Sequence, residues 1–416
     1  MKARILQLVD SFDQGGSERQ ALELTRLLHD SGKFEVYLAS LKPGGALRGS
    51  LEGLNLGEMP SYPLKSFYDR NALAQLRRFV HHLRSARIDL LHTHDFYTNI
   101  FGMTAGFLAG VKVRIASRRE TNGMRSTAQQ KAQRLAYSLA HQIVANSESV
   151  RRKLIEEGVN GRKITVIHNG LSLQRVTPPV NASREEALKA LGVRVVSEAS
   201  NPGPKHFVTI VANMRHDIKD YPMFLRAAQR VCKAIPDVGL LLAGEGELRK
   251  SIEELAAQLG ITDNTFLLGR CESIAQLLNV SDVCVLSSKA EGFSNSILEY
   301  MAAARPVVAT DVGGAREAIS EGATGYVVPS GNDELMAERI VSLLRDPARA
   351  RLMGEAGRRV VEEKFSSTAL LQKTEALYEQ LLADRVRTEN SGFRKTVTAG
   401  GVDISQPAGA SPPSQR

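Results

Sequence analysis

Apolar, strand-like runs alternate with amphipathic helical stretches along the first half of the chain. The candidate strands are RILQLVDSF, EVYLASL, DLLHTH, RIASR, QIVANS and ITVIHNG. Helical sequences such as SERQALELTRLLHDSG and NALAQLRRFVHHLRSA separate them. This alternation is typical of a parallel sheet with helices on both faces. We therefore predict one doubly wound α/β domain over residues 1–175.

The same rhythm resumes after a break. Residues 176–206 mix proline, glycine and polar residues around one candidate helix, which is typical of a linker. Residues 207–366 then supply a second set of strands: FVTIVANM, VGLLLAGEG, NTFLLGR, VCVLSS and RPVVATDV. The predicted fold class is α/β, with two Rossmann-like doubly wound parallel-sheet domains. Because ligands of such sheets bind beyond the carboxyl ends of the strands, two facing domains define a cleft.

The last part of the chain changes character. Residues 367–387 predict a C-terminal helix, TALLQKTEALYEQLLADR within it being strongly helical in pattern. Residues 388–416 hold few large apolar side chains and much glycine, serine and proline, so we expect a disordered tail there.

Length and composition indicate a globular protein without a membrane span. The 416 residues are 43% hydrophobic and 24% charged, which suits two domains with full cores. The longest apolar patch, residues 100–111, is too short for a bilayer that needs about 20 residues. Asp10 and Asp13 interrupt the N-terminal apolar run, which argues against a signal peptide. Three cysteines without a C-x-x-C pair fit core packing in a reducing compartment, and we expect a cytoplasmic protein.

The positive charge lies entirely in the first half. The formal net charge is +11 for residues 1–175 and −2 for the rest. Such asymmetry indicates an anionic partner, either nucleic acid, a membrane surface or an acidic substrate, although solvated helix faces are the simpler reading. The candidate cations are Arg77, Arg78 and Arg84 on one helix and Arg118, Arg119 and Arg125 in a loop.

Candidate binding groups lie at strand ends of the first half. Gly15 and Gly16 separate a strand from a helix, and the free NH groups of such a helix start can bind an anion, although the pair is also an ordinary turn. His92 and His94 alternate on a strand and share a face. The His-x-His-Asp segment is also able to hold a metal, but no further His or Cys cluster at a recognisable spacing completes such a site. We therefore expect His94 to hydrogen-bond a substrate in the cleft and His92 to pack.

The second half carries two further candidates. Arg215 and Lys219 follow a strand, where two cations neutralise a diphosphate. Glu291 precedes a helix that begins near Ser294 or Asn295, and Glu299 lies about one turn inside it. The two carboxylate oxygens of Glu299 suffice for both hydroxyls of a ribose, although the side chain would also balance the helix dipole.

Taken together, these motifs resemble those of the retaining glycosyltransferases of the GT-B fold in the large group called family four. The resemblance rests on GGSE, HTHDF, HNG at 168–170, the Lys219 loop, AGEGELR, LLGR, EGFSNSILE and GYVVPSGN. It covers nearly everything except the linker and tail, and the E-x7-E segment followed by PVVATDVGG is its specific part.

The resemblance implies a role for each matching residue. Glu291 and the backbone of Gly292, Phe293, Ser294 and Asn295 would hold the donor sugar, and Glu299 the ribose. Lys219 would hold the diphosphate, which Gly15 and Gly16 face, and His94 would contact the transferred sugar. Gly269 and Arg270 would meet the nucleobase, Gly244 and Gly246 would line the same pocket, and Gly313 and Gly314 would support it with backbone NH groups. The C-terminal helix would cross back to the first domain, as it often does in such folds.

One departure stands out: Asn213 occupies a position where the family commonly has arginine, and Arg215 is the candidate substitute. The implied reaction moves a sugar from a UDP or GDP sugar to a hydroxyl of a glycan or lipid-linked acceptor, with retention and with no metal or cofactor. Nucleic acid is then not expected as a partner, whereas the inner face of an anionic membrane is. A sugar-nucleotide epimerase and a non-catalytic nucleotide-sugar-binding protein are the alternatives.

Overall fold

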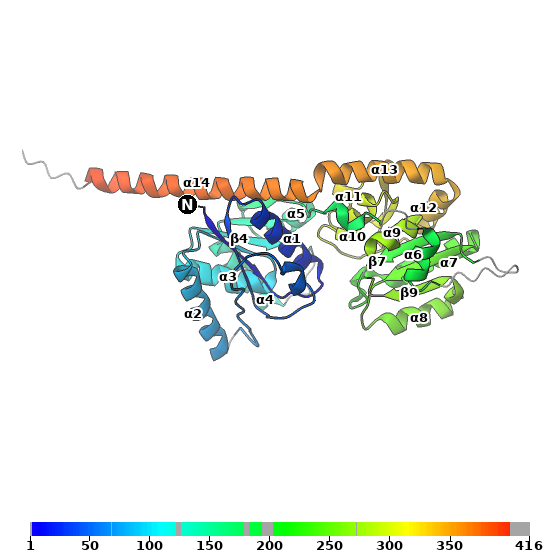
Figure 1. Cartoon of the computed structure of the whole chain (residues 1–416), viewed down its shortest axis with the longest axis horizontal. Coiled ribbons are helices and arrows are strands. Elements are labelled where there is room, and N and C mark those ends of the chain that lie inside the picture. Colours follow the sequence, from blue (N-terminus) through cyan, green and yellow to red (C-terminus); the bar gives the residue numbers. More distant parts are fainter. Residues whose placement is uncertain are drawn as a thin grey trace, which may run out of the picture.

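The computed structural model describes residues 2–67, 69–121, 126–178, 183–193, 203–271 and 273–399. Two parallel six-stranded sheets form the centres of two lobes, which lie side by side in Figure 1. The predicted fold class is confirmed.

The first sheet has the strand order β2-β1-β3-β4-β5-β6, and each neighbouring pair is parallel. Its strands are β1 (Arg4–Val9), β2 (Glu35–Ser40), β3 (Leu90–Thr93), β4 (Val113–Arg118), β5 (Gln142–Ala145) and β6 (Ile164–Val166). Its helices are α1 (Gly16–Asp30), α2 (Arg70–Ser85), α3 (Phe96–Ala109), α4 (Thr127–Leu139) and α5 (Glu148–Glu156). The strands are mostly buried, which explains why they are near-continuous apolar runs in the sequence.

The second sheet has the order β12-β11-β10-β7-β8-β9 and is also parallel. Its strands are β7 (His206–Val211), β8 (Val238–Ala243), β9 (Thr265–Gly269), β10 (Val283–Leu286), β11 (Val307–Thr310) and β12 (Gly325–Val328). Its helices are α6 (Arg184–Ala190), α7 (Tyr221–Ala234), α8 (Arg249–Gln258), α9 (Ile274–Val280), α10 (Asn295–Ala302), α11 (Ala315–Ala318), α12 (Asp333–Arg345) and α13 (Pro347–Lys364). The sequence analysis did not single out β12 as a strand, because its apolar run is only YVV.

The C-terminal helix α14 (Ser367–Ala399) leaves α13 and lies along the first domain (Figure 1). Lys33 forms an ion pair with Glu375 of this helix, and Tyr378 is fully buried against the first sheet. The helix continues beyond residue 387, where the sequence analysis ended it, because no proline interrupts the chain before Pro407 and extending a formed helix is easy. The expected disordered tail therefore differs over residues 388–399, and its remainder, residues 400–416, lies outside the described residues.

The chain crosses between the domains twice, and the two crossings contact each other. The first crossing contains Leu171, and the second joins α13 to α14 through Ser366. A parallel bridge pairs Leu171 with Ser366: the Leu171 NH donates to the Phe365 carbonyl at 2.9 Å, and the Ser367 NH donates to the Leu171 carbonyl at 3.0 Å. The two interdomain connections therefore lie next to each other.

Among the residues that the structure describes, no helix is long and apolar enough to cross a membrane.

Candidate functional site

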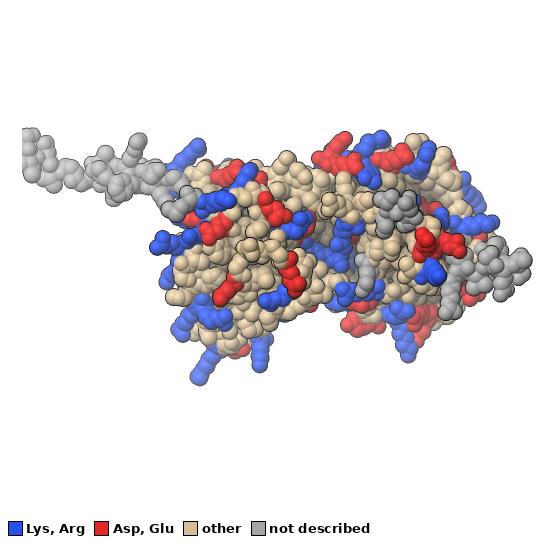
Figure 2. Space-filling view, viewed as in Figure 1, with Lys and Arg blue, Asp and Glu red and all other residues tan. Residues whose placement is uncertain are grey.

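A cavity of about 410 Å³ lies between the carboxyl ends of the two sheets. Most of the predicted site residues line it: Gly15, Gly16, Arg215, Lys219, Gly244, Arg270, Glu291, Phe293, Ser294, Asn295 and Glu299, together with Asn213. Figure 2 shows basic side chains gathered in the hollow between the lobes. His94, Gly246, Gly269 and Gly292 do not line it.

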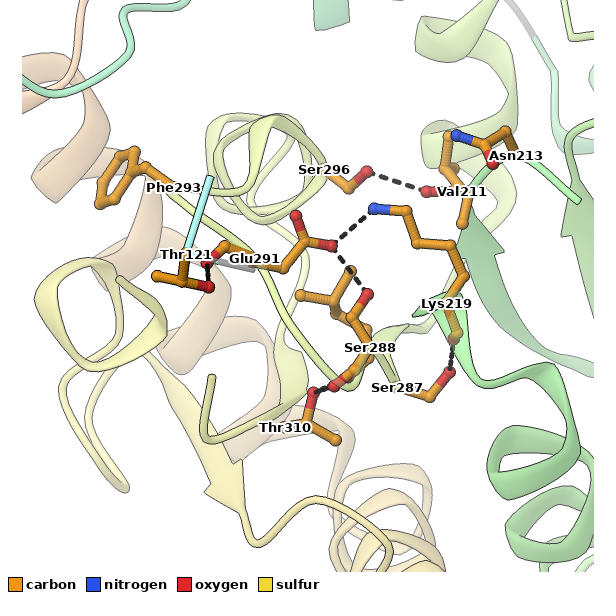
Figure 3. A network of polar contacts seen from close by, with 12 residues as sticks. Thr121, Val211, Asn213, Lys219, Ser287, Ser288, Glu291, Phe293, Ser296 and Thr310 are labelled. Carbon is orange, nitrogen blue, oxygen red and sulfur yellow. Dashed lines mark hydrogen bonds and ion pairs between the residues drawn. The ribbon is translucent and has the colours of Figure 1, made fainter. Parts of the chain in front are cut away.

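Lys219 and Glu291 form an ion pair in this cavity (Figure 3). The Lys219 Nζ lies 2.6 Å from the Glu291 Oε1, which also accepts a hydrogen bond from Ser288 at 2.7 Å. The Ser287 hydroxyl holds the Lys219 carbonyl at 2.8 Å. Both bonds of the Glu291 side chain end on one oxygen. Its other oxygen is therefore available to a hydroxyl, while the ammonium is available to an anion.

Local backbone geometry positions Lys219. Asp220 follows it in the left-handed conformation, with φ of +46°, and its carboxylate caps α7 by accepting from the Met223 NH. Aspartate tolerates this conformation better than most residues and is a preferred helix cap. The cap ends the Lys219 loop sharply, so the lysine side chain turns toward Glu291 (Figure 3).

Glu299 is paired with a residue that the sequence analysis did not select. Its side chain is nearly buried, and its Oε1 accepts from the Nε of Arg175 at 2.8 Å. Arg175 belongs to a short 3-10 helix, Leu173–Val176, that follows the first crossing. The carboxylate of Glu299 is thus held by a specific cation rather than by the dipole of its own helix.

Glycines allow the loops around the cavity to touch. A Cβ at Gly292 would lie 2.1 Å from the carbonyl oxygen of Arg119, so only glycine lets the two domains meet at this point. Gly244 and Gly246 adopt φ near +150°, and a Cβ at Gly244 would lie 1.8 Å from the Ala212 carbonyl oxygen. Gly246 and Gly269 support the pocket from behind rather than lining it.

Gly313 and Gly314 were expected to support the pocket with backbone NH groups, and the structure shows what Gly314 contacts. The Gly314 NH donates to the Gly292 carbonyl at 2.7 Å. Neither residue lines the cavity. The backbone of the two glycines packs against the Glu291–Gly292 segment. Gly313 lies against the carbonyls of that segment and has a φ of +58°.

His94 is buried beside the cavity and not exposed in it. Its Nε2 lies 2.6 Å from the Gln7 Oε1, whereas its Nδ1 is buried and has no hydrogen-bond partner among the described residues. Burial lowers the pKa of His94 well below its usual value, so the imidazole is neutral. His94 and Arg119 line a small neighbouring cavity of about 40 Å³, which shares Ser17 and Arg119 with the larger one.

A buried network fixes the histidines from behind. Tyr378 of α14 accepts from the Gln7 Nε2 at 3.1 Å and lies 2.5 Å from the His92 Nδ1. The His92 Nε2 in turn contacts the Ser117 hydroxyl at 2.7 Å. Since Gln7 presents its oxygen to His94, the proton of that ring lies on Nε2, and Nδ1 is an acceptor. No group of three or more potential metal ligands occurs in the described part of the chain.

Comparison with known families decides the identity of this arrangement. Residues 14–175 match the family described as Glycosyltransferase Family 4, and residues 196–360 match Glycosyl transferases group 1. The chain is a family-four glycosyltransferase. The two matches meet at the linker and include both sides of the cavity.

Curated relatives of this family-four glycosyltransferase come from several pathways. N-acetyl-alpha-D-glucosaminyl L-malate synthase of Bacillus anthracis is 37% identical over 148 residues, which cover 36% of this chain and 39% of that protein. The capsular polysaccharide biosynthesis glycosyltransferase CapM of Staphylococcus aureus is 28% identical over 259 residues, covering 61% of this chain and 65% of CapM. The chain thus spans less than two thirds of the length of either relative.

Solved structures support the GT-B fold. Anabaena HepE in complex with UDP-glucose superposes with a TM-score of 0.76 at 21% identity, and the alignment covers 90% of this chain and 99% of HepE.

The sequence pattern did not indicate that the following three polar residues line the cavity. Arg119, Asn146 and Asn169 line the cavity and follow β4, β5 and β6. The Asn169 amide accepts from Arg119 and donates to the Phe293 carbonyl and to Asn295, each at 2.8 Å. Their positions after strands were the available signal, since the rule about strand ends applies to every strand of a parallel sheet.

The expected basic loop is not a single exposed patch. Arg118 is only 4% exposed and pairs with Glu157, which lies at the end of α5. Arg119 points into the cavity region, and Arg125 lies outside the described residues. Arg118 and Arg119 therefore do not belong to the same surface as Arg77, Arg78 and Arg84.

Proposed function

We propose that this family-four glycosyltransferase moves a sugar from a UDP or GDP sugar to a hydroxyl of a glycan or lipid-linked acceptor, with retention of the anomeric configuration. The observation that carries the proposal is the single cavity in which Lys219, Glu291 and Glu299 converge from separate segments of the second domain. A nucleotide sugar has one anionic centre between two hydroxylated ends, and the three side chains match this order.

The cations and helix starts of the cavity supply the catalysis in this proposal. Negative charge grows on the departing diphosphate, so Lys219, Arg215 and the NH groups at the start of α1 stabilise the transition state more than the ground state. The Lys219 ammonium exchanges its bond to Glu291 for a phosphate oxygen. Glu291 then orients the sugar whose bond breaks. The leaving phosphate is the group that takes the acceptor proton.

Asn213 supports a division of labour among the remaining cations. Its side chain reaches the cavity but accepts from the Arg215 NH at 3.3 Å. Arg215 is exposed, lines the cavity and makes no ion pair among the described residues. We assign Arg215 to the diphosphate in place of the arginine that Asn213 replaces. UDP is the first nucleotide to test, because the HepE structure contains UDP-glucose.

The outer surface of the first domain supports an anionic membrane as the place of action. Helix α3 contacts both α2 and α4, and none of the three helices contains Asp or Glu. The exposed side chains of α2 include Arg77, Arg78 and Arg84. Basic side chains lie at the lower left of Figure 2, where Figure 1 places α2. Exposed apolar side chains accompany them: Leu73, Tyr97, Phe107, Leu108 and Leu135. Cations beside apolar side chains suit the inner face of a membrane that holds a lipid-linked acceptor.

A donor screen tests the proposed reaction. The protein is incubated with UDP and GDP sugars, with and without membrane extract, and the released nucleotide diphosphate and the sugar products are measured. We expect release from at least one donor, an increase with extract, and loss of release in Lys219→Ala. An isomerised nucleotide sugar without a transfer product would indicate the epimerase. Tight nucleotide binding without release from any donor would indicate a binding protein.

A further inference from the structure

Unpartnered buried polar atoms gather at one edge of the cavity. Among the described residues, the His94 Nδ1, the Arg119 Nε and the Asn146 Oδ1 are buried without a hydrogen bond. These residues follow β3, β4 and β5 of the first sheet, so they stand side by side at its carboxyl edge. Buried polar atoms are nearly always paired in native proteins, and three neighbouring exceptions beside a cavity indicate a ligand.

Arg119 is the dominant group of this edge. Its Nη1 donates to the Asn169 Oδ1 at 2.8 Å, and it has no carboxylate partner among the described residues. Burial lowers the pKa of the Arg119 guanidinium to about 10, so the group is still charged at neutral pH. The charge of Glu18 raises the pKa of Arg119 in part, but no ion pair joins the two side chains among the described residues. A buried guanidinium without a paired anion is unfavourable, and its planar fork fits a carboxylate or a phosphate.

Three carboxylates line the cavity, Glu245, Glu291 and Glu299, and none of them forms an ion pair with Arg119 among the described residues. Glu291 pairs with Lys219, and Glu299 pairs with Arg175. The donor diphosphate has Lys219 and Arg215 on the second domain, where the nucleotide is proposed to bind. Arg119 stands on the opposite wall, in the first domain, and its carbonyl packs against Gly292 beside the sugar-orienting Glu291.

Asn146 provides, at the same edge, an acceptor for a hydroxyl of a ligand. Its Nδ2 donates to the Arg119 carbonyl at 3.3 Å, which leaves the Oδ1 as an acceptor. A charged donor next to an amide acceptor recognises an anionic group that lies close to a hydroxyl. Sugar acids and sugar phosphates carry this pair.

Resting on the proposed function, we propose that Arg119 and Asn146 form an acceptor subsite, which binds a sugar unit bearing a carboxylate or a phosphate next to the transferred sugar. The growing glycan is then acidic where it meets the enzyme. The transferred sugar itself is the other source of such an anion, and the experiment separates the two.

The test measures binding of matched probes to the full chain with saturating UDP. Methyl α-D-glucuronoside and D-glucose 6-phosphate are the anionic probes, and methyl α-D-glucoside is the neutral one. We expect the parent to bind an anionic probe at least about tenfold more tightly, the usual effect of a charge-assisted hydrogen bond. Arg119→Met should abolish the preference, and Arg119→Lys should keep part of it. Arg152→Met, on the exposed surface of α5, is the matched control and should keep all of it.

The opposite results are equally defined. Equal binding of all three probes by the parent, or an unchanged preference in Arg119→Met, overturns the subsite. A second arm compares UDP release from UDP-glucuronate and UDP-glucose. If Arg119→Met changes the choice between these donors but not between the probes, the anion belongs to the transferred sugar and the acceptor assignment is wrong. A parent that prefers anionic probes but releases UDP from no donor refutes the proposed function and leaves the subsite standing.

Discussion

Arg175 donates from its Nε to the Oε1 of Glu299 across 2.8 Å, which joins the segment after the first interdomain crossing to the nucleotide side of the cavity. A nucleotide whose ribose uses Glu299 has to share or replace this bond. Glu299 is thus the first residue to test for nucleotide affinity.

Glu299→Ala should weaken UDP binding about tenfold to a hundredfold, because a hydrogen bond to a charged group contributes about 1.5 to 3 kcal/mol. Calorimetric titration with UDP measures the effect. Arg175→Met serves as the control, since it removes the partner and keeps the carboxylate. An unchanged affinity in Glu299→Ala would assign the carboxylate to the structural pairing with Arg175 alone.

Glu291→Ala should mainly slow turnover. The carboxylate is proposed to orient the sugar at the breaking bond, where misplacement costs about a hundredfold in rate. Turnover at saturating donor and UDP affinity are measured separately, and only the first should fall strongly. Ser288→Ala is the matched control, because it removes one hydrogen bond to Glu291 and leaves the carboxylate in place. Transfer by Glu291→Ala at the parent rate would contradict the role.

Tyr378→Phe should impair transfer although the residue lies in α14, outside both sheets. The change leaves Gln7 without its partner at 3.1 Å and frees the amide that orients His94. We expect a several-fold lower turnover and an unchanged affinity for UDP. Lys33→Met breaks the ion pair between the first domain and Glu375 of the same helix, and it leaves Tyr378 and Gln7 unchanged. If the two variants behave alike, Tyr378 acts only by attaching the helix.

Acidification should destabilise the protein partly through His92. Burial lowers the pKa of His92 from its usual 6.5 to about 3. Below pH 6.5 His92 is protonated in the unfolded chain but stays neutral in the folded chain, so the free energy of unfolding decreases as the pH falls toward 3. Asp95 acts in the opposite direction, since burial raises its pKa to about 7. Urea unfolding at several pH values should therefore show a slope that is shallower in His92→Gln than in the parent, by up to about 1.4 kcal/mol per pH unit. Parallel slopes would show that His92 is protonated in the folded state.

Binding to anionic vesicles should depend on the exposed arginines of α2. Replacing Arg77, Arg78 and Arg84 by Gln should reduce binding to vesicles rich in phosphatidylserine, with a loss of about 1 kcal/mol for each residue at low salt. Replacing the exposed Lys233, Lys250 and Arg351 of the second domain is the charge-matched control and should have little effect. Negligible binding of the parent at low salt would remove the membrane from the proposal.

The sequence predicts the fold better than the site, because strands and helices follow from local patterns whereas side-chain pairs of the site form only when distant segments pack together. The buried parallel strands are three to six residues long and mostly apolar, and β12 was the one strand of the described residues that the sequence pattern did not indicate. Glu291 and Glu299 were found because their spacing follows from one strand–loop–helix unit, β10 to α10, and Lys219 because it follows another strand, β7. Their partners were not all found, since Arg175 meets Glu299 only after the domains have packed.

Burial explains the remaining differences. His94 was expected to reach into the cleft, but Gln7 holds it in the wall through a contact between residues that are 87 positions apart. Arg118 was expected at the surface, yet its neighbour in space is Glu157 of α5. A single sequence shows which residues are able to pair but not which of them the tertiary structure brings together.

The bridge between Leu171 and Ser366 determines how the two lobes can move. Because the two connections are hydrogen-bonded to each other, they join the lobes at one margin of the cleft and form a hinge there. The lobes can rotate about this hinge, whereas sliding or twisting of one lobe against the other would break the hydrogen bonds between the two connections. Donor and acceptor then enter from the side opposite the hinge, and a single rotation opens both binding surfaces.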